Sequence, residues 1–128
     1  MPTIVVETTA RDTGLERGFA RAVSQWLRHE GVDLNHVITK FLPADPARVY
    51  SGPFLLAGPA GDARPFAFVR CTVGRDRTDA FRRGLAAEIV RALAPAIPPA
   101  LVFIQFEPVD PQLHFIGSDA ERRTGDVH

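Results

Sequence analysis

The chain has 128 residues, a length that fits one domain and leaves little room for two. Hydrophobic residues make up 45% of the sequence and aromatic residues 9%, which is enough for a packed core and excludes a disordered chain. The formal net charge is zero. We therefore expect neither a nucleic-acid partner nor a membrane surface, because both select an excess of basic residues.

Cysteine usage and the N-terminus indicate a cytoplasmic protein. Cys71 is the single cysteine, so there is no intrachain disulfide framework, as expected in a reducing compartment. No apolar run reaches the length of about 18 residues that spans a membrane. The start, Met1 to Glu7, lacks the basic beginning and long apolar stretch of a signal peptide.

The first part of the chain predicts a strand, a helix and a second strand. Residues 2–8 are rich in β-branched side chains, which favour a strand. Thr13 can cap a helix, and apolar residues recur at helical spacing from Leu15 to Leu27. Gly31 ends this helix. Residues 36–42 then predict the second strand.

Residues 43–65 form a turn-rich connection. They hold five of the 11 prolines, with a short strand or hairpin expected at residues 49–56. The connection also contains Tyr50 and Phe54. We expect these side chains to be buried, since large apolar side chains are costly to expose together.

The last part repeats the strand, helix and strand order. Residues 66–73 are a nearly continuous apolar run, typical of a strand in the centre of a sheet. Thr78 can cap the next helix, whose apolar stripe runs from Phe81 to Leu93. Residues 101–106 predict the final strand, and Pro108 is expected to end it.

The two parts resemble each other, which indicates an internal repeat. The shared positions are Arg11-Asp12 with Arg75-Asp76, Thr13 with Thr78, and Gly18-Phe19 with Gly84-Leu85. We predict one α+β domain over residues 1–128, with β-α-β units at 2–45 and 66–118 and a tail at 119–128. The units would form a four-stranded mixed sheet with two helices on one face. Other subunits would cover the opposite face.

Pro2 is the main candidate for a catalytic residue. A small second residue allows Met1 to be removed, which would leave a secondary amine at the N-terminus. An α-amine has a pKa of about 8, and desolvation or nearby cations lower that value. Such a group can both accept and donate a proton near neutral pH. The alternative is a common Met-Pro start with no role, and a retained Met1 would leave an amide at Pro2.

Arg75 and Arg77 flank Asp76 just before the second helix. Arginine binds planar carboxylates bidentately, and the N–H groups at a helix start favour anions. These two residues would bind a substrate carboxylate, or they are a solvated loop cluster. Arg70 is a third candidate anion contact, or it forms an ion pair with Glu7 or Glu107.

Histidine and glutamate side chains are further candidates. His29 ends the first helix and His36 opens the predicted second strand; either could polarise a substrate or water, although a histidine at a helix end often serves the helix dipole. Glu107 would orient water or an arginine, or it is a surface charge. We expect Cys71 to be a small core residue. No metal-ligand spacing or phosphate-binding glycine pattern is present, so we predict no metal and no cofactor.

Pro2 after Met1, the paired β-α-β units and the arginine-rich entry to the second helix together resemble the tautomerase superfamily. This superfamily includes 4-oxalocrotonate tautomerase and macrophage migration inhibitory factor, and the resemblance covers residues 2–118. It implies a cofactor-independent homotrimeric enzyme. It also implies that Pro2 is the acid or base and that Arg75 and Arg77 hold the substrate carboxylate.

Two subfamilies look closest. The stretch from His36 to Phe41 resembles cis-3-chloroacrylic acid dehalogenases, and the Arg75-Asp76-Arg77 spacing is similar to malonate semialdehyde decarboxylases. The sequence departs from both. Gly74 stands where the dehalogenases have an essential arginine, and His36 stands where the decarboxylases have a water-activating aspartate.

The sequence leaves three candidate functions. The first is keto–enol tautomerisation of a small 2-oxo or 2-hydroxy unsaturated carboxylic acid. The second is decarboxylation or hydrolytic dehalogenation of a C3 acid, with His29, His36 or Glu107 handling water. The third is a non-enzymatic trimeric binding protein, because a fold does not fix a function.

Overall fold

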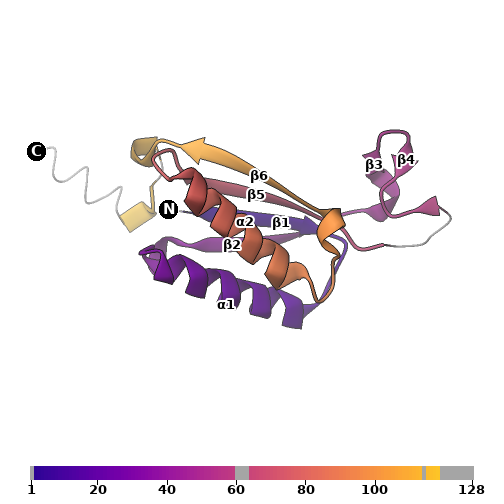
Figure 1. The fold of residues 1–128 in the computed structure, drawn as a ribbon, viewed down its shortest axis with the longest axis horizontal. Coiled ribbons are helices and arrows are strands. Elements are labelled where there is room, and N and C mark those ends of the chain that lie inside the picture. Colours follow the sequence, from indigo (N-terminus) through magenta and orange to yellow (C-terminus); the bar gives the residue numbers. More distant parts are fainter. Residues whose placement is uncertain (1, 60–63, 114, 119–128) are drawn as a thin grey trace, which may run out of the picture.

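Two β-α-β units follow each other along the chain and share one sheet (Figure 1). The computed structural model describes residues 2–59, 64–113 and 115–118; Met1, whose removal the Pro2 hypothesis requires, and the predicted tail lie outside them. The first unit is β1 (Thr3–Thr8), α1 (Thr13–His29) and β2 (Ile38–Pro43), and the second is β5 (Ala67–Gly74), α2 (Asp79–Leu93) and β6 (Val102–Val109). Between them lie the two short strands β3 (Tyr50–Ser51) and β4 (Phe54–Leu55).

The four long strands form one mixed sheet in the order β2-β1-β5-β6. β1 pairs parallel with β2 and antiparallel with β5, and β5 pairs parallel with β6. Both helices lie on the same face of this sheet (Figure 1). The predicted fold class, a four-stranded mixed sheet with two helices on one face, is confirmed.

The helices begin and pack as their apolar spacing predicts, with one correction at a cap. Asp12, not Thr13, is the N-cap of α1, because its Oδ1 accepts a hydrogen bond from the Gly14 N–H at 2.8 Å. Thr78 caps α2 as predicted, accepting from the Phe81 N–H at 3.1 Å. The buried stripes are Leu15, Phe19, Val23 and Leu27 on α1, and Phe81, Leu85, Ile89 and Leu93 on α2.

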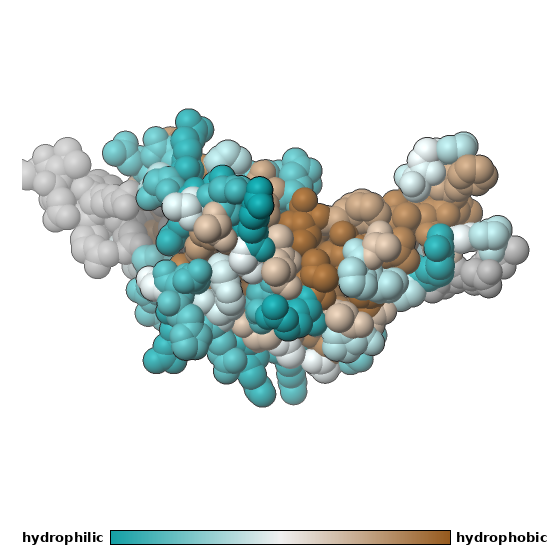
Figure 2. All heavy atoms as spheres, viewed as in Figure 1, coloured by the Kyte–Doolittle hydropathy of each residue, from teal (hydrophilic) through white to brown (hydrophobic). Residues whose placement is uncertain are grey.

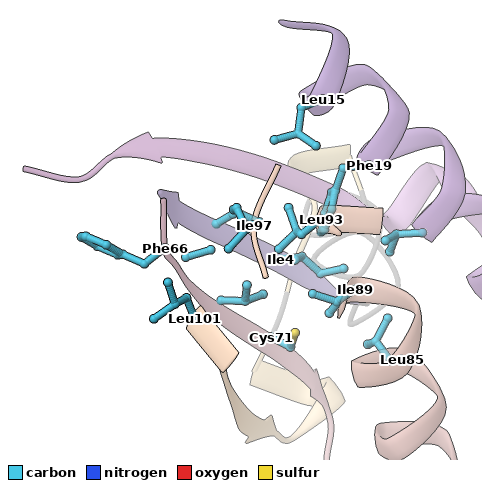
Figure 3. Packing of buried hydrophobic residues seen from close by; sticks show 14 of the residues in the cluster. Ile4, Leu15, Phe19, Phe66, Cys71, Leu85, Ile89, Leu93, Ile97 and Leu101 are labelled. Carbon is cyan, nitrogen blue, oxygen red and sulfur yellow. The ribbon is translucent and has the colours of Figure 1, made fainter. Parts of the chain in front are cut away.

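The core lies between the helices and the sheet (Figure 3). Ile4 of β1 and Ile89 of α2 are fully buried in it. Cys71 of β5 is also fully buried, and this burial raises the pKa of its thiol to about 12. Its interpretation as a core residue is confirmed, since a thiol that keeps its proton behaves as a small apolar side chain.

Two predicted strand boundaries are wrong. Residues 34–36 form a 3-10 helix, which Asp33 caps through the Asn35 N–H at 3.0 Å. The second strand therefore starts at Ile38, and His36 precedes it instead of opening it. Pro108 does not end the last strand, which continues to Val109. β6 is an edge strand with a single neighbour, and such a strand tolerates a residue without an N–H group.

The predicted hairpin is present, but its apolar side chains are exposed. Tyr50 is 61% exposed and Phe54 75% exposed, contrary to the expectation that they are buried. The hairpin stands apart from the body of the molecule (Figures 1 and 2). Leu56 and Ala57, at its base, do reach the core. The hairpin is therefore anchored at its base, while the aromatic side chains of its strands are largely exposed to solvent in the single chain.

The sheet face away from the helices is uncovered. Side chains alternate across a sheet, so this face carries the strand positions that do not point at the core. It includes Ile38, Leu42 and Phe103, which are 56%, 38% and 41% exposed. Within the described segments, no helix combines the length and apolar character needed to cross a membrane.

Candidate active site

The strand directions bring the start of β1 and the end of β5 to one edge of the sheet. Pro2 directly precedes β1, and its carbonyl accepts a hydrogen bond from the Ile38 N–H at 3.2 Å. Arg75 directly follows β5, and its N–H donates to the Val109 carbonyl at 2.9 Å. Since β1 and β5 are antiparallel neighbours with Thr3 opposite Thr72, Pro2 and Arg75 lie at the same edge.

Pro2 is buried at this edge. If the nitrogen stays shielded from water after Met1 is removed, desolvation disfavours the charged form of the amine. Once Met1 is removed, a secondary amine in this position is suited to accept a proton. Its carbonyl bond to Ile38 holds the ring at the start of the strand, so the nitrogen has a fixed place.

Arg75 is exposed at the same edge. Its backbone bond to Val109 links the end of β5 to the end of β6. The backbone is thereby held while the long side chain extends into solvent. A fixed backbone and an exposed side chain suit an arginine that binds the carboxylate of a ligand.

Arg77 takes a different direction from the one that the sequence suggests. Its guanidinium lies 4.7 Å from the centroid of the Phe81 ring, in a cleft between the end of α1 and the start of α2 that also includes Glu30 and Asp76. Pro2 is not part of the lining of this cleft. Sequence analysis missed Phe81 as a partner, although the two residues are four apart at a helix start, a spacing that favours contact.

The two candidate histidines lie at this edge as well. α1 runs back towards the start of β1 and ends at His29, whose side chain is exposed. His36 ends the 3-10 helix that leads into β2, and it is partly buried. The fold therefore places His36 closer to the sheet layer, next to the strand whose first N–H bonds to Pro2.

Arg70 and Glu107 form an ion pair on the uncovered sheet face. The Arg70 Nε lies 3.2 Å from the Glu107 Oε1, and the two side chains are 64% and 44% exposed. Of the alternatives that the sequence left open, the partner is Glu107 and not Glu7. Arg70 sits opposite Val5, in the middle of the sheet and away from the edge that carries Pro2.

Within the described residues, no group of three or more histidine, cysteine, aspartate or glutamate side chains is arranged to hold a metal ion.

Comparisons with solved structures identify the fold. No protein-family model and no curated protein matches the sequence. FG41 malonate semialdehyde decarboxylase inhibited by 3-bromopropiolate is similar over 97% of this chain and 96% of its own, with TM-score 0.71 and 21% identity. The F6 fused 4-OT, an asymmetric trimer, gives TM-score 0.72 over 96% and 98% at 16% identity. Pt0534 inactivated by 2-oxo-3-pentynoate gives 0.73 over 90% and 91% at 12% identity.

The chain has the tautomerase-superfamily fold. At these identities the likeness is one of architecture, and it covers nearly all of each chain. The predicted resemblance is therefore confirmed at the level of the fold. The roles of Pro2 and Arg75 stay predictions.

Within this tautomerase-superfamily fold, the space beside Gly74 is occupied. A β-carbon at position 74 would lie 2.7 Å from the Asp76 Oδ1, closer than real contacts allow. An arginine at this position, as in the dehalogenases that the sequence resembles, would require the Asp76 side chain to rotate away. Asp76 is exposed, so its side chain is free to make this rotation.

Proposed function

We propose that this protein is an enzyme that tautomerises a small 2-oxo or 2-hydroxy unsaturated carboxylic acid, with Pro2 as its general acid and base. The observation that carries the proposal is the position of buried Pro2 at the same sheet edge as Arg75. With Met1 removed, this arrangement offers a secondary amine and an exposed guanidinium, the two groups that proton transfer next to a carboxylate requires.

The proposed reaction needs no other reactant. The Pro2 nitrogen accepts the proton of the substrate's enol hydroxyl and returns a proton to carbon, so that the C=C bond moves and a C=O bond forms. Arg75 binds the carboxylate and stabilises the negative charge of the dienolate between the two steps. Arg77 faces the separate cleft beside Phe81, so a second contact with the carboxylate requires its side chain to turn towards Pro2, with its in-plane N–H groups as the donors.

Two assays test this proposal directly. N-terminal mass spectrometry should find Pro2 as the first residue. Ketonisation of phenylenolpyruvate and 2-hydroxymuconate, followed by ultraviolet absorbance, should then slow at least about a hundredfold in Pro2→Ala, in the range that acid–base catalysis contributes. Arg75→Ala should also slow it, whereas Arg21→Ala, an exposed arginine on α1, should not. Equal rates in all four proteins would overturn the site assignment and favour a non-enzymatic binding protein.

A second candidate is a lyase that decarboxylates or hydrates a C3 acid. It is favoured by the similarity to malonate semialdehyde decarboxylase together with the Arg75-Asp76-Arg77 sequence. In this reaction Pro2 remains protonated as an acid, and His29, His36 or Glu107 handles water. The protonation state of Pro2 at neutral pH separates the two candidates, because a tautomerase base must be neutral there.

We also propose that the protein assembles as a homotrimer. The uncovered sheet face with exposed Ile38, Leu42 and Phe103 supports burial against other subunits. A chain of similar fold, the F6 fused 4-OT, is a trimer. Light scattering coupled to size-exclusion chromatography measures the mass, and a monomer at all concentrations would contradict this assembly.

A further inference from the structure

A hollow lies at the other end of β1, away from Pro2. Its volume is about 280 Å³, near the lower end of ordinary small-molecule pockets, which run from about 300 to 1,000 Å³. It is formed where β1 and β2 end and α1 begins. The proposed reaction uses none of its lining residues, so the hollow is free to serve a separate purpose.

Two lining residues of this hollow are fixed in place by their own contacts. Thr8 is 3% exposed, and its hydroxyl donates to the Phe66 carbonyl at 2.7 Å and accepts from the Ala10 N–H at 3.0 Å. The Phe41 ring meets the Phe19 ring edge to face, with centroids 5.4 Å apart. Because these side chains are already ordered, a ligand that binds here loses little free energy to ordering them.

Arg11 and Glu16 bring opposite charges to the hollow. Arg11 is exposed and Glu16 is partly buried. Among the residues that the structure describes, neither side chain makes an ion pair, with the other or with a third residue. The adjacent acid, Asp12, serves instead as the N-cap of α1. A pocket with an unpaired cation and an unpaired anion is complementary to a ligand that carries both charges.

The internal repeat gives Arg11 a counterpart. Arg11 follows β1 at the position of the repeat where Arg75 follows β5, and β1 and β5 are antiparallel neighbours. Arg11 therefore stands at one end of the sheet as Arg75 stands at the other. The proline that matches Pro2 is Pro65, just ahead of β5, and its nitrogen is an amide within the chain. This end of the sheet thus has a guanidinium for a carboxylate but no basic nitrogen beside it.

We propose that this hollow binds a free α-amino acid with an apolar side chain, without changing it chemically. The carboxylate meets Arg11, which can hold it through two parallel N–H donors. The ammonium group meets Glu16. The side chain packs on the apolar lining residues Phe41, Leu42 and Pro43. A free amino acid is favoured over a peptide, because the backbone groups inside a peptide are amides and carry neither charge.

Titration of the full chain with L-phenylalanine, followed by ¹⁵N–¹H NMR, tests the site. Saturable shifts are expected at the amides of residues 8–16 and 41–42 at roughly millimolar ligand, as for a small molecule with few contacts. 3-Phenylpropanoate lacks the ammonium group and phenethylamine lacks the carboxylate, so each should bind at least about tenfold more weakly. Equal binding of the three compounds, or no saturable shift at these amides, would overturn the site.

Two substitutions test the charged contacts. Arg11→Ala and Glu16→Gln should each weaken phenylalanine binding at least about tenfold, the effect of losing one charge-assisted hydrogen bond. The matched control is Arg17→Ala, since Arg17 is an exposed arginine on α1 that does not line the hollow. Binding that is as tight in Arg11→Ala as in Arg17→Ala would contradict the inference.

This inference goes beyond the proposed reaction and does not depend on it. Arg11→Ala should leave ketonisation unchanged, and Arg75→Ala should leave phenylalanine binding unchanged, because the two arginines lie at opposite ends of the sheet. Phenylalanine shifts that disappear in Arg75→Ala would place the ligand beside Pro2 and overturn the inference. Ketonisation without phenylalanine binding would overturn it alone, whereas phenylalanine binding without ketonisation would support it and count against the proposed reaction.

Discussion

The Arg77 guanidinium stacks on the Phe81 ring at 4.7 Å, and this contact places a positive charge over the first turn of α2. The N–H groups at a helix start add to the attraction for an anion there. The Arg77 carbonyl also accepts a hydrogen bond from Arg82 at 2.7 Å, so both the backbone and the side chain of this residue are held. A held cation binds a carboxylate with less loss of side-chain freedom than a mobile one.

We therefore expect Arg77→Ala to raise the KM of the carboxylate substrate about tenfold or more, which corresponds to the loss of one charge-assisted hydrogen bond. Arg77→Lys should recover only part of this, because an ammonium group neither stacks on Phe81 as well nor binds bidentately. The control is Arg83→Ala, an exposed arginine paired with Asp79 on the same helix. Equal KM values for the two alanine variants would remove Arg77 from the binding site.

The pH dependence of the reaction should report on Pro2. A tautomerase base must be neutral to accept a proton, so kcat/KM should rise with pH through the pKa of the Pro2 amine. Burial disfavours the ammonium form, and we expect this pKa to lie below the usual α-amine value of about 8. Titration of ¹⁵N-proline-labelled protein by NMR measures it directly.

An uncleaved N-terminal tag is the control for this experiment. It converts the Pro2 nitrogen to an amide without altering any other residue, so the tagged chain should be inactive and should gain activity when a protease exposes Pro2. A tagged chain with full activity would show that the nitrogen takes no part. A Pro2 pKa above the usual α-amine range would favour the lyase candidate instead.

The fold could be predicted from the sequence because its signals are local and periodic. The apolar stripe from Leu15 to Leu27 identifies α1, and the apolar run through Cys71 identifies a central strand. The choice of Asp12 over Thr13 as a helix cap could not be predicted, because both side chains accept hydrogen bonds and the backbone decides between them.

The candidate site was predictable in part. The alternation of antiparallel and parallel strands brings Pro2 and Arg75 to one edge, and this follows from the repeat of two β-α-β units. The direction of the Arg77 side chain depends on packing against Phe81, which single-residue patterns do not specify. The exposure of Tyr50 depends on how far the hairpin stands from the core, and the local sequence pattern does not specify that distance.

The buried thiol of Cys71 should make stability depend on pH in the alkaline range. Burial raises its pKa from 9.0 to about 12, so below pH 9.0 both the folded and the unfolded chain keep the proton and the contribution is fully present. Above that value the unfolded chain loses the proton first. The free energy of unfolding should therefore fall by up to about 1.4 kcal/mol per pH unit from this group.

Urea unfolding between about pH 8 and pH 10.5 measures this effect. Cys71→Ala should be less stable than the wild type at the lower pH, because it removes buried volume, and the difference should shrink as the pH rises. Parallel stability curves for the two proteins would show that the folded thiol ionises as readily as the unfolded one.

Gly18 and Gly84 occupy matching places in the two repeats, yet the structure predicts opposite effects of adding a methyl group. A β-carbon at Gly18 would have no atom within 4 Å, whereas one at Gly84 would lie 2.5 Å from the Trp26 Cζ2. Trp26 also packs on Phe81, with ring centroids 5.4 Å apart, so it cannot move away without disturbing the contact between the helices.

Gly18→Ala should therefore raise the free energy of unfolding by about 0.5–1 kcal/mol, since alanine favours a helix and loses less backbone entropy on folding than glycine. Gly84→Ala should lower it by about 1–3 kcal/mol through overpacking against Trp26. Urea midpoints of the two variants measure both effects against one wild type. If both variants raise the free energy of unfolding, the close approach of α2 to Trp26 is not a feature of the folded protein in solution, because helix propensity alone would then account for the result.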